Sequence, residues 1–96
     1  MRLDKFLQVS RLVRRRTLAN HLCDGGHVWR DGRRARASAE VVAGDVLEVD
    51  YGWRRLTVRV VAVPAGQVAR SAAAGLYEVV RDDRQGPPPP DDEEGM

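Results

Sequence analysis

The spacing of apolar side chains changes along this chain, and the change predicts two kinds of element. Leu3, Phe6 and Leu7 recur at i, i+3, i+4, which predicts a short helix over residues 3–10. After a basic linker, a second helix is predicted over residues 16–24. Its inner face is formed by Leu18, Ala19, Leu22 and Cys23. Two glycines follow and end the helix, because glycine adopts the left-handed conformation without steric cost.

From residue 27 the period becomes two, which is typical of strands. Strands predicted over residues 27–30 and 33–37 are joined by Asp31-Gly32, the sequence of a type I′ hairpin turn. Strict alternation predicts a half-buried strand over residues 46–51, with a turn at residues 52–54 after it. Three further elements are predicted: a strand over 56–63, a short Ala-rich helix over 69–74 and an apolar stretch over 76–80.

These elements predict an α+β fold, with two N-terminal helices packed on a small, mostly antiparallel sheet. A chain of 96 residues allows one domain with one small core. We expect this domain to span residues 1–81, with the last strand as a C-terminal extension. Beyond it the apolar periodicity ends, and four prolines and an acidic run predict a disordered tail over residues 82–96.

Charge is sorted along the chain. The first 36 residues hold ten of the sixteen Lys and Arg and three of the fourteen carboxylates, a net charge of +7. Residues 60–96 carry three arginines and seven carboxylates, a net −4, and the whole chain carries +2. This asymmetry indicates a polyanionic partner, most often a nucleic acid. All cations but one are Arg, which fits phosphate binding and fits GC-rich codon usage equally.

The basic residues gather around the predicted helix starts. Arg14, Arg15 and Arg16 stand just before or at the start of the second helix, where unpaired backbone N–H groups and the helix dipole attract phosphate. Arg2 and Lys5 lie at the start of the first helix, which the short linker can fold back beside the second. The alternative is a solvated charged surface without a ligand, which the local size of the imbalance disfavours.

Other chemistry has little support in the sequence. His21, Cys23 and His27 form the one possible metal trio, but His21 and Cys23 point to different faces of a helix, so we expect no metal and no cofactor. The chain has no phosphate-binding loop, nucleophile elbow or firmly held carboxylate pair, and we expect no catalytic residues and no enzyme activity. No secretory signal and no apolar run of the ~20 residues that span a bilayer are present. With its single cysteine, the chain fits a cytoplasmic protein without a membrane partner.

Trp29 has two interpretations. If Val28 points into the core, Trp29 points outward from its strand, where its ring could stack on a base or a sugar. Packing over a neighbouring strand or the Ala-rich helix is the more common role for such a residue.

The order of these motifs resembles the small RNA-binding domain named after ribosomal protein S4. The resemblance rests on residues 2–7 (RLDKFL), 15–19 (RRTLA), 26–32 (GHVWRDG) and 42–49 (VAGDVLEV), and it covers about residues 1–51. Within that family the chain is similar to the stand-alone ribosome-associated quality-control factors of the RqcP type, which share the start of the chain and residues 35–38 (ARAS).

The resemblance implies a non-catalytic role in protein biosynthesis. RqcP-type factors bind the large ribosomal subunit that still holds a stalled peptidyl-tRNA, contact its rRNA and the tRNA, and work with an RqcH-type factor that supports C-terminal alanine tailing. Arg2 and Arg16 match the family's RNA-contacting residues, and Lys5, Arg15 and Arg36 match them more loosely. We therefore predict that a monomer binds RNA phosphates through Arg2, Lys5, Arg15 and Arg16, with Asn20 and Arg36 extending the surface.

Two alternatives stay open. A fifteen-kilodalton heat-shock protein of the same family binds separated large subunits, and its Leu-Tyr-Glu stretch is similar to residues 76–78. The other alternative is a protein-interaction adaptor that acts through the acidic, Pro-rich tail. Steep salt dependence of RNA binding would favour the RNA-binding interpretation over the adaptor. Arg30 departs from the resemblance, because the family often has an apolar residue at this strand position.

Overall fold

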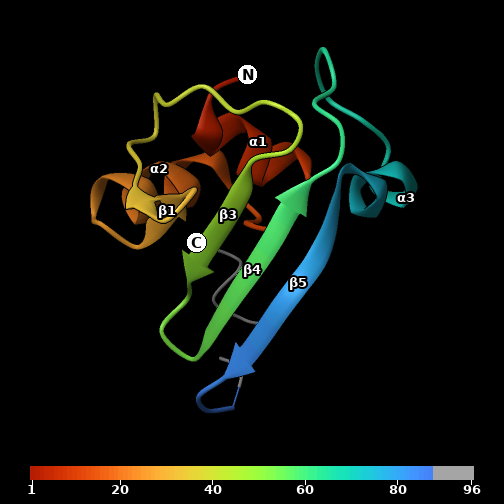
Figure 1. Cartoon of the computed structure of the whole chain (residues 1–96). Helices are drawn as coiled ribbons and strands as arrows, with labels where there is room; N and C mark the ends of the chain where they lie inside the picture. Colours follow the sequence, from red (N-terminus) through yellow and green to blue (C-terminus); the bar gives the residue numbers. More distant parts are fainter. Residues whose placement is uncertain (88–96) are drawn as a thin grey trace.

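The computed structural model describes residues 1–87 and confirms the α+β class. Helices and strands follow one another as α1 (Leu3–Val9), α2 (Arg16–Asp24), β1 (Val28–Arg30), β2 (Arg33–Arg34), β3 (Val46–Asp50), β4 (Arg54–Val60), α3 (Arg70–Ala73), the 3-10 turn η1 (Ala74–Leu76) and β5 (Tyr77–Arg84). The five strands form one antiparallel sheet in the order β2-β1-β3-β4-β5 (Figure 1). All neighbours except the β1–β3 pair are consecutive strands. Tight turns join β1 to β2 and β3 to β4, and a longer connection that contains α3 and η1 joins β4 to β5.

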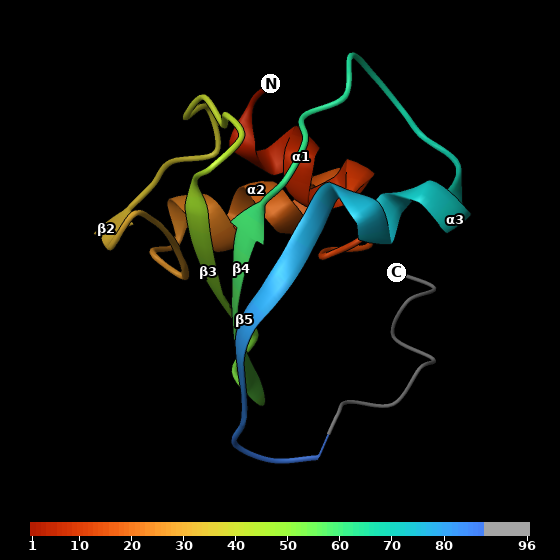
Figure 2. The same cartoon turned by 45° about the vertical axis from the view of Figure 1, so that its right-hand side comes forward.

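Both N-terminal helices cover the same face of the sheet. Figure 2 shows α1 and α2 against the end where β4 finishes, with α3 beside them at the start of β5. β4 and β5 pair along their whole length and form the β4–β5 arm, whose far end extends past the helices with the end of β3 beside it. The fold therefore has a thick helical part and a thin sheet part.

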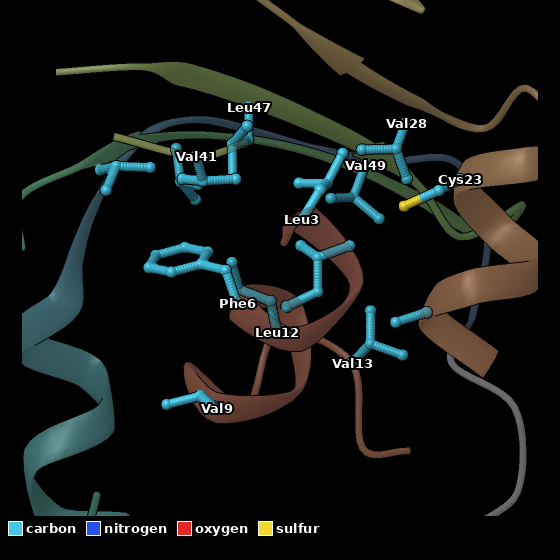
Figure 3. Packing of buried hydrophobic residues seen from close by; sticks show 14 of the residues in the cluster. Leu3, Phe6, Val9, Leu12, Val13, Cys23, Val28, Val41, Leu47 and Val49 are labelled. Carbon is cyan, nitrogen blue, oxygen red and sulfur yellow. The ribbon is translucent and has the colours of Figure 1, made fainter. Parts of the chain in front are cut away.

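The core lies between α1 and the sheet. Leu3, Phe6 and Leu7 are fully buried, as the helical spacing predicts, and they meet Leu47 and Val49, which the alternation of β3 points inward (Figure 3). On α2, Ala19 and Cys23 complete this core and Leu22 packs against it. Leu18 does not, because α2 buries only Ala19 and Cys23. Its side chain is 50% exposed, so the prediction of an inward Leu18 is wrong.

The hairpin after β1 has the predicted conformation. Asp31 and Gly32 have φ values of 53° and 85°, which is the positive φ that a type I′ turn needs at both central positions. The return strand β2 is shorter than predicted. Beyond Arg34 the chain leaves the sheet and crosses the start of α1, where the carbonyls of Ala37 and Ala39 accept hydrogen bonds from the N–H groups of Asp4 and Leu3. Two of the helix's unpaired donors are satisfied in this way.

The last two strands differ from the prediction, because β4 starts earlier and ends at Val60, before the predicted end at residue 63, and β5 is longer than the predicted stretch. β4 begins at Arg54, inside the predicted turn, and β5 continues to Arg84, so the predicted domain boundary after residue 81 falls within a strand. A diagonal cross-strand pair explains the early start of β4 and the late end of β5, because Arg54 donates to Asp82 at 2.8 and 2.9 Å. Most of the tail predicted to be disordered, residues 88–96, lies outside the described residues.

Candidate nucleic-acid interface

A buried carboxylate stands at the centre of the basic region. Asp4 lies in the first turn of α1 and is 2% exposed, although it is charged and close to the chain end. The loop over residues 37–41 closes over this turn, because its backbone pairs with residues 1–4. Burying an unpaired carboxylate is costly, so the surrounding donors have to compensate it.

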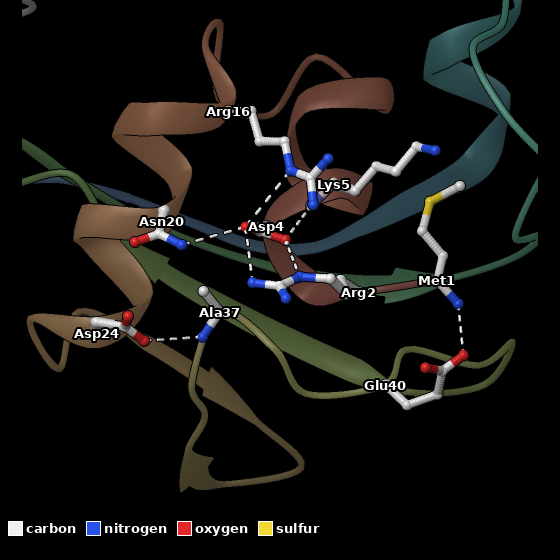
Figure 4. Close-up of polar contacts among 9 residues, drawn as sticks. All are labelled: Met1, Arg2, Asp4, Lys5, Arg16, Asn20, Asp24, Ala37 and Glu40. Atoms are coloured by element: carbon white, nitrogen blue, oxygen red, sulfur yellow. Dashed lines mark hydrogen bonds and ion pairs between the residues drawn. The ribbon is translucent and has the colours of Figure 1, made fainter.

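Five donors surround the Asp4 carboxylate (Figure 4). Arg2 donates from Nε to Oδ1 at 3.2 Å and from its Nη2 to Oδ2 at 3.4 Å. The Lys5 backbone N–H donates at 2.8 Å and the Asn20 amide at 3.3 Å, while the Arg16 Nε lies 3.5 Å from Oδ2. Asp4 therefore joins the first turn of α1 to the first two turns of α2.

These contacts keep Asp4 ionised. Burial alone would raise its pKa, but hydrogen bonds from Arg2 and Asn20, the charge of Arg16 and the N–H of Lys5 outweigh burial, so the pKa of this carboxyl lies below its ordinary value. At neutral pH the cluster holds two guanidiniums and one carboxylate. One positive charge is left over before Lys5 is counted.

The two arginines keep a solvent-facing side. The side chains of Arg2 and Arg16 are 48% and 49% exposed, whereas that of Asp4 is 3% exposed. A guanidinium carries five N–H donors, and Asp4 engages only those on the inner side. Asp4 thus fixes the position of both groups and leaves donors available to an anion. Phosphate is the anion that such paired guanidiniums match in shape and charge.

The other predicted site residues lie at different distances from this centre. Lys5 is half-buried and its side chain runs away from Asp4 in Figure 4. Arg15 is exposed and is the N-cap residue of α2, next to Arg16. Asn20 is half-buried and acts as a donor to Asp4, so it supports the cluster from the side of α2.

Arg36 belongs to a separate basic surface. It lines a hollow of about 510 Å³ formed by the β1–β2 hairpin and the loop after it, together with Arg30, Arg33 and Arg34. Arg30 is anchored there by a 2.6 Å hydrogen bond to the Glu40 carbonyl and a 3.8 Å ion pair with Asp45, which explains how a charge is tolerated at this strand position. The structure therefore joins Arg2, Arg16 and Asn20 and places Arg36 in the hairpin surface.

Sequence reasoning missed the role of Asp4. A carboxylate in the first turn of a helix is common, because the dipole favours it, and it does not by itself indicate a cluster. The signal lies in the surroundings of Asp4, which is enclosed by apolar neighbours and flanked by Arg2 and Lys5. A carboxylate at such a position is buried once the helix packs, and it then needs cationic partners.

Trp29 points away from the core, as predicted, and its ring is covered from within the protein. The Arg55 guanidinium of β4 lies 4.4 Å from the ring centroid, across the outer face of the sheet, and Arg55 also pairs with Glu48 of β3. This arrangement favours packing over the neighbouring strands.

The structure offers little support for other chemistry in the part it describes. Within residues 1–87, no three His, Cys, Asp or Glu side chains come together as metal ligands. Burial raises the pKa of the Cys23 thiol to about 12, helped by the charges of Asp4 and Asp24, so this thiol is a poor nucleophile. Among the same residues, no helix has both the length and the apolar character to cross a bilayer.

The chain is similar in sequence to known proteins. Residues 1–47, from α1 into β3, match the S4 domain family. The RQC P-site tRNA stabilizing factor of Bacillus subtilis (strain 168) is 41% identical over 86 residues, which cover 90% of this chain and 99% of the relative. A relative of the same description from Halalkalibacterium halodurans is 42% identical over 83 residues, 86% of this chain and 93% of the relative.

Solved structures share the fold. Vibrio cholerae Heat Shock Protein 15, described as trimeric, superposes with a TM-score of 0.77 at 29% identity and covers 83% of this chain and 81% of that chain. The solution structure of the hypothetical protein HP1423 gives a TM-score of 0.73 at 37% identity, over 86% of this chain and all of that chain.

Two helices with arginines at their starts, packed on one face of a small antiparallel sheet, define an S4-domain protein together with the match over residues 1–47. Its nearly full-length similarity to the Bacillus subtilis relative is more specific. The chain belongs to the family of RQC P-site tRNA stabilizing factors, which confirms the resemblance seen in the sequence.

Proposed function

We propose that this protein is an RNA-binding factor of ribosome-associated quality control. In this proposal it binds the rRNA of a free large ribosomal subunit and the peptidyl-tRNA held there, and it supports C-terminal alanine tailing of the stalled chain. The observation that carries the proposal is the pair of half-exposed guanidiniums, Arg2 and Arg16, held together by one buried carboxylate. The family described as RQC P-site tRNA stabilizing factors supports the choice of RNA.

The proposed mechanism is clamping, without making or breaking a bond. Arg2 and Arg16 bind phosphates of one RNA segment, and Lys5 and Arg15 bind phosphates beside them. Because Asp4 positions the guanidiniums before the RNA arrives, less side-chain entropy is lost on binding. The hairpin surface with Arg36 contacts a second segment, so that rRNA and tRNA are bridged. A tRNA held in this way stays in place while an RqcH-type tailing factor extends the chain.

A second candidate function has its own support. The resemblance to Vibrio cholerae Heat Shock Protein 15 favours a factor that recycles separated large subunits with bound peptidyl-tRNA. Both functions use the same RNA-binding surface, and they differ in whether alanine tails depend on the protein.

We further propose a cytoplasmic protein that is monomeric away from the ribosome. An adaptor role of the acidic tail concerns residues outside the described part and stays a prediction.

The experiment compares two double variants with equal loss of charge. Arg2→Ala with Arg16→Ala removes the guanidiniums around Asp4, whereas Arg59→Ala with Arg81→Ala removes two arginines that pair with carboxylates on the sheet. Binding to large subunits is measured by co-sedimentation over a range of salt concentrations. If about five phosphates are neutralised, log K of the wild type falls against log salt with a slope of roughly −3.5 to −4.5.

We expect the first double variant to leave the subunits and to lower the steepness of the salt slope by about 2, while the second behaves as the wild type. In cells, only the first should stop supporting alanine tails. A slope near zero for the wild type would contradict electrostatic RNA binding. Equal binding by both double variants would contradict the site, and intact tailing with lost subunit binding would favour the recycling function.

A further inference from the structure

A second basic pocket lies outside the cluster around Asp4. It is a cavity of about 330 Å³ between the linker that joins α1 to α2 and the short helix α3. Ser10, Arg11 and Arg14 line it from the linker side, Arg70 and Ala73 from α3, and Tyr77 from the start of β5. Arg70 is 54 or more residues away from the linker in sequence and lies beyond the part of the chain that matches the S4 domain.

The charge of this pocket has one sign. Among the residues that the structure describes, three guanidiniums line it and no carboxylate does. Within residues 1–87, neither Arg11 nor Arg70 takes part in an ion pair, and both side chains are exposed. Like charges brought together by folding repel one another, so an anionic ligand would relieve this repulsion.

The backbone at Arg11 is held in an unfavourable conformation. Its φ of 67° is in the left-handed region, where a residue with a Cβ is strained and glycine is not. Its N–H still donates to the Gln8 carbonyl at 3.1 Å, so the turn belongs to the end of α1. An arginine at a position that suits glycine indicates that its side chain has a use, since strain of this kind gathers at functional sites.

α3 is fixed against the linker side of the molecule. The Gln67 amide donates to the Gln8 side chain at 2.8 Å, and Ala73 and Leu76 are buried. Arg70 is therefore held at the pocket by packing and by a hydrogen bond to α1. The floor of the pocket combines the small Ala73 with the half-buried Tyr77, a surface that suits a ribose or the face of a base.

The same linker also leads to the first site. Arg11 and Arg16 are five residues apart, which bounds their Cα separation at about 18 Å. One RNA strand can therefore meet both places. Resting on the proposed function, we infer that the pocket between the α1–α2 linker and α3 takes one nucleotide of the same RNA that Arg2 and Arg16 bind. Its phosphate contacts Arg11 and Arg70, and its sugar or base lies over Tyr77.

The test uses Arg70→Ala, the charge-retaining Arg70→Lys, and Arg81→Ala as a control on the outer side of β5, where Arg81 pairs with Asp83. Labelled tRNA and free large subunits serve as probes, and binding is measured against salt. We expect Arg70→Ala to weaken binding roughly five- to tenfold and to lower the steepness of the salt slope by about 1. Arg70→Lys should recover most of the loss, and Arg81→Ala should bind as the wild type.

Arg11→Gly is an independent test of the pocket, because it removes the guanidinium. Glycine suits the positive φ at this position, so the fold should be retained. We expect it to weaken binding about as much as Arg70→Ala. The inference is wrong if Arg70→Ala and Arg11→Gly bind RNA as the wild type does while Arg16→Ala binds more weakly. The proposed function would then stand, and an acidic protein partner would be the remaining ligand for the pocket. Equal losses for Arg70→Ala and Arg81→Ala would also overturn it, since net charge alone would then be acting. A wild type that binds neither probe would overturn the proposed function and this inference together.

Discussion

The arginines of the helical part and those of the β4–β5 arm have the same side chain in different electrostatic surroundings. On the arm, four arginines each have a carboxylate of their own: Arg54 with Asp82, Arg55 with Glu48, Arg59 with Glu78, and Arg81 with Asp83. In the helical part, Arg2 and Arg16 share the single carboxylate of Asp4. These four pairs are neutral, and the fifth arginine of the arm, Arg84, lies over the Trp53 ring, 5.8 Å from its centroid. The cluster around Asp4 keeps a positive charge in its centre.

This difference shows why the number of arginines alone does not locate the interface. Paired charges cancel beyond a few ångströms, and surface pairs add little to stability. A cluster with more cations than anions produces a field that attracts a polyanion. The carboxylate inside the cluster has another effect, because it holds the guanidiniums in one place. We therefore expect the position of the charges around Asp4 to matter more than their sum.

Asp4→Asn tests this expectation and should have the largest effect. The amide retains one acceptor oxygen but turns N–H donors toward two guanidiniums, so we expect a loss of about 1–3 kcal/mol in the free energy of unfolding. RNA affinity should fall although the net charge of the protein rises by one, because Arg2 and Arg16 are no longer held. Urea denaturation and tRNA binding measure the two effects. An increase in RNA affinity would show that net charge outweighs positioning.

Tyr51→Phe tests how firmly the two parts are connected. The Tyr51 hydroxyl, just after β3, donates to the Leu12 carbonyl in the α1–α2 linker at 2.6 Å. Burial raises the pKa of Tyr51 to about 12, so this donor keeps its proton over the ordinary pH range. Removing it leaves a backbone acceptor without its partner, and we expect to lose about 1–2 kcal/mol in urea denaturation. A change below about 0.5 kcal/mol would show that packing alone positions the linker.

Acid should weaken the helical cluster in a defined direction. The pKa of Asp4 is lowered in the folded protein, so the unfolded chain binds a proton at this residue at higher pH than the folded one. The stabilisation from ionised Asp4 is present above its unfolded pKa of about 4 and is lost as pH falls through the folded pKa. We expect thermal unfolding between pH 5 and pH 3 to change less in Asp4→Asn than in the wild type. Parallel curves would contradict this role of Asp4.

The elements that local spacing determines were predicted well. The bounds of α2 and the start of α1 follow directly from helical periodicity, and the positive φ values at Asp31 and Gly32 follow from turn chemistry. Arg2 and Arg16 were predicted as neighbours, because a short linker between two helices leaves few ways to pack them. In each case the relevant interactions lie close together in sequence.

Features that depend on distant partners could not be predicted from the spacing. Arg54 is polar and comes directly after Gly52-Trp53, and only Asp82 across the sheet reveals that it belongs to a strand. Leu18 has the right spacing for an inner face, but α2 buries only Ala19 and Cys23 and leaves Leu18 in solvent. The pocket near Arg70 likewise exists only because α3 folds back onto the linker.

Glu78→Gln is the smallest change and tests the comparison most directly. It removes the carboxylate that pairs with Arg59 at 2.6 Å, adds the same single charge as Asp4→Asn, and does not touch the helical cluster. Both partners are about half exposed, so the free energy of unfolding should stay within about 0.5 kcal/mol of the wild type. If the paired carboxylates keep the arm arginines from binding RNA, the affinity of Glu78→Gln for tRNA should rise slightly at low salt. At higher salt, where exposed charges are screened, this affinity should return to the wild-type value. Titration of labelled tRNA at two salt concentrations measures this. A rise in RNA affinity as large as the loss in Arg2→Ala with Arg16→Ala would mean that any unpaired arginine binds RNA equally well. The geometry around Asp4 would then contribute nothing to RNA affinity.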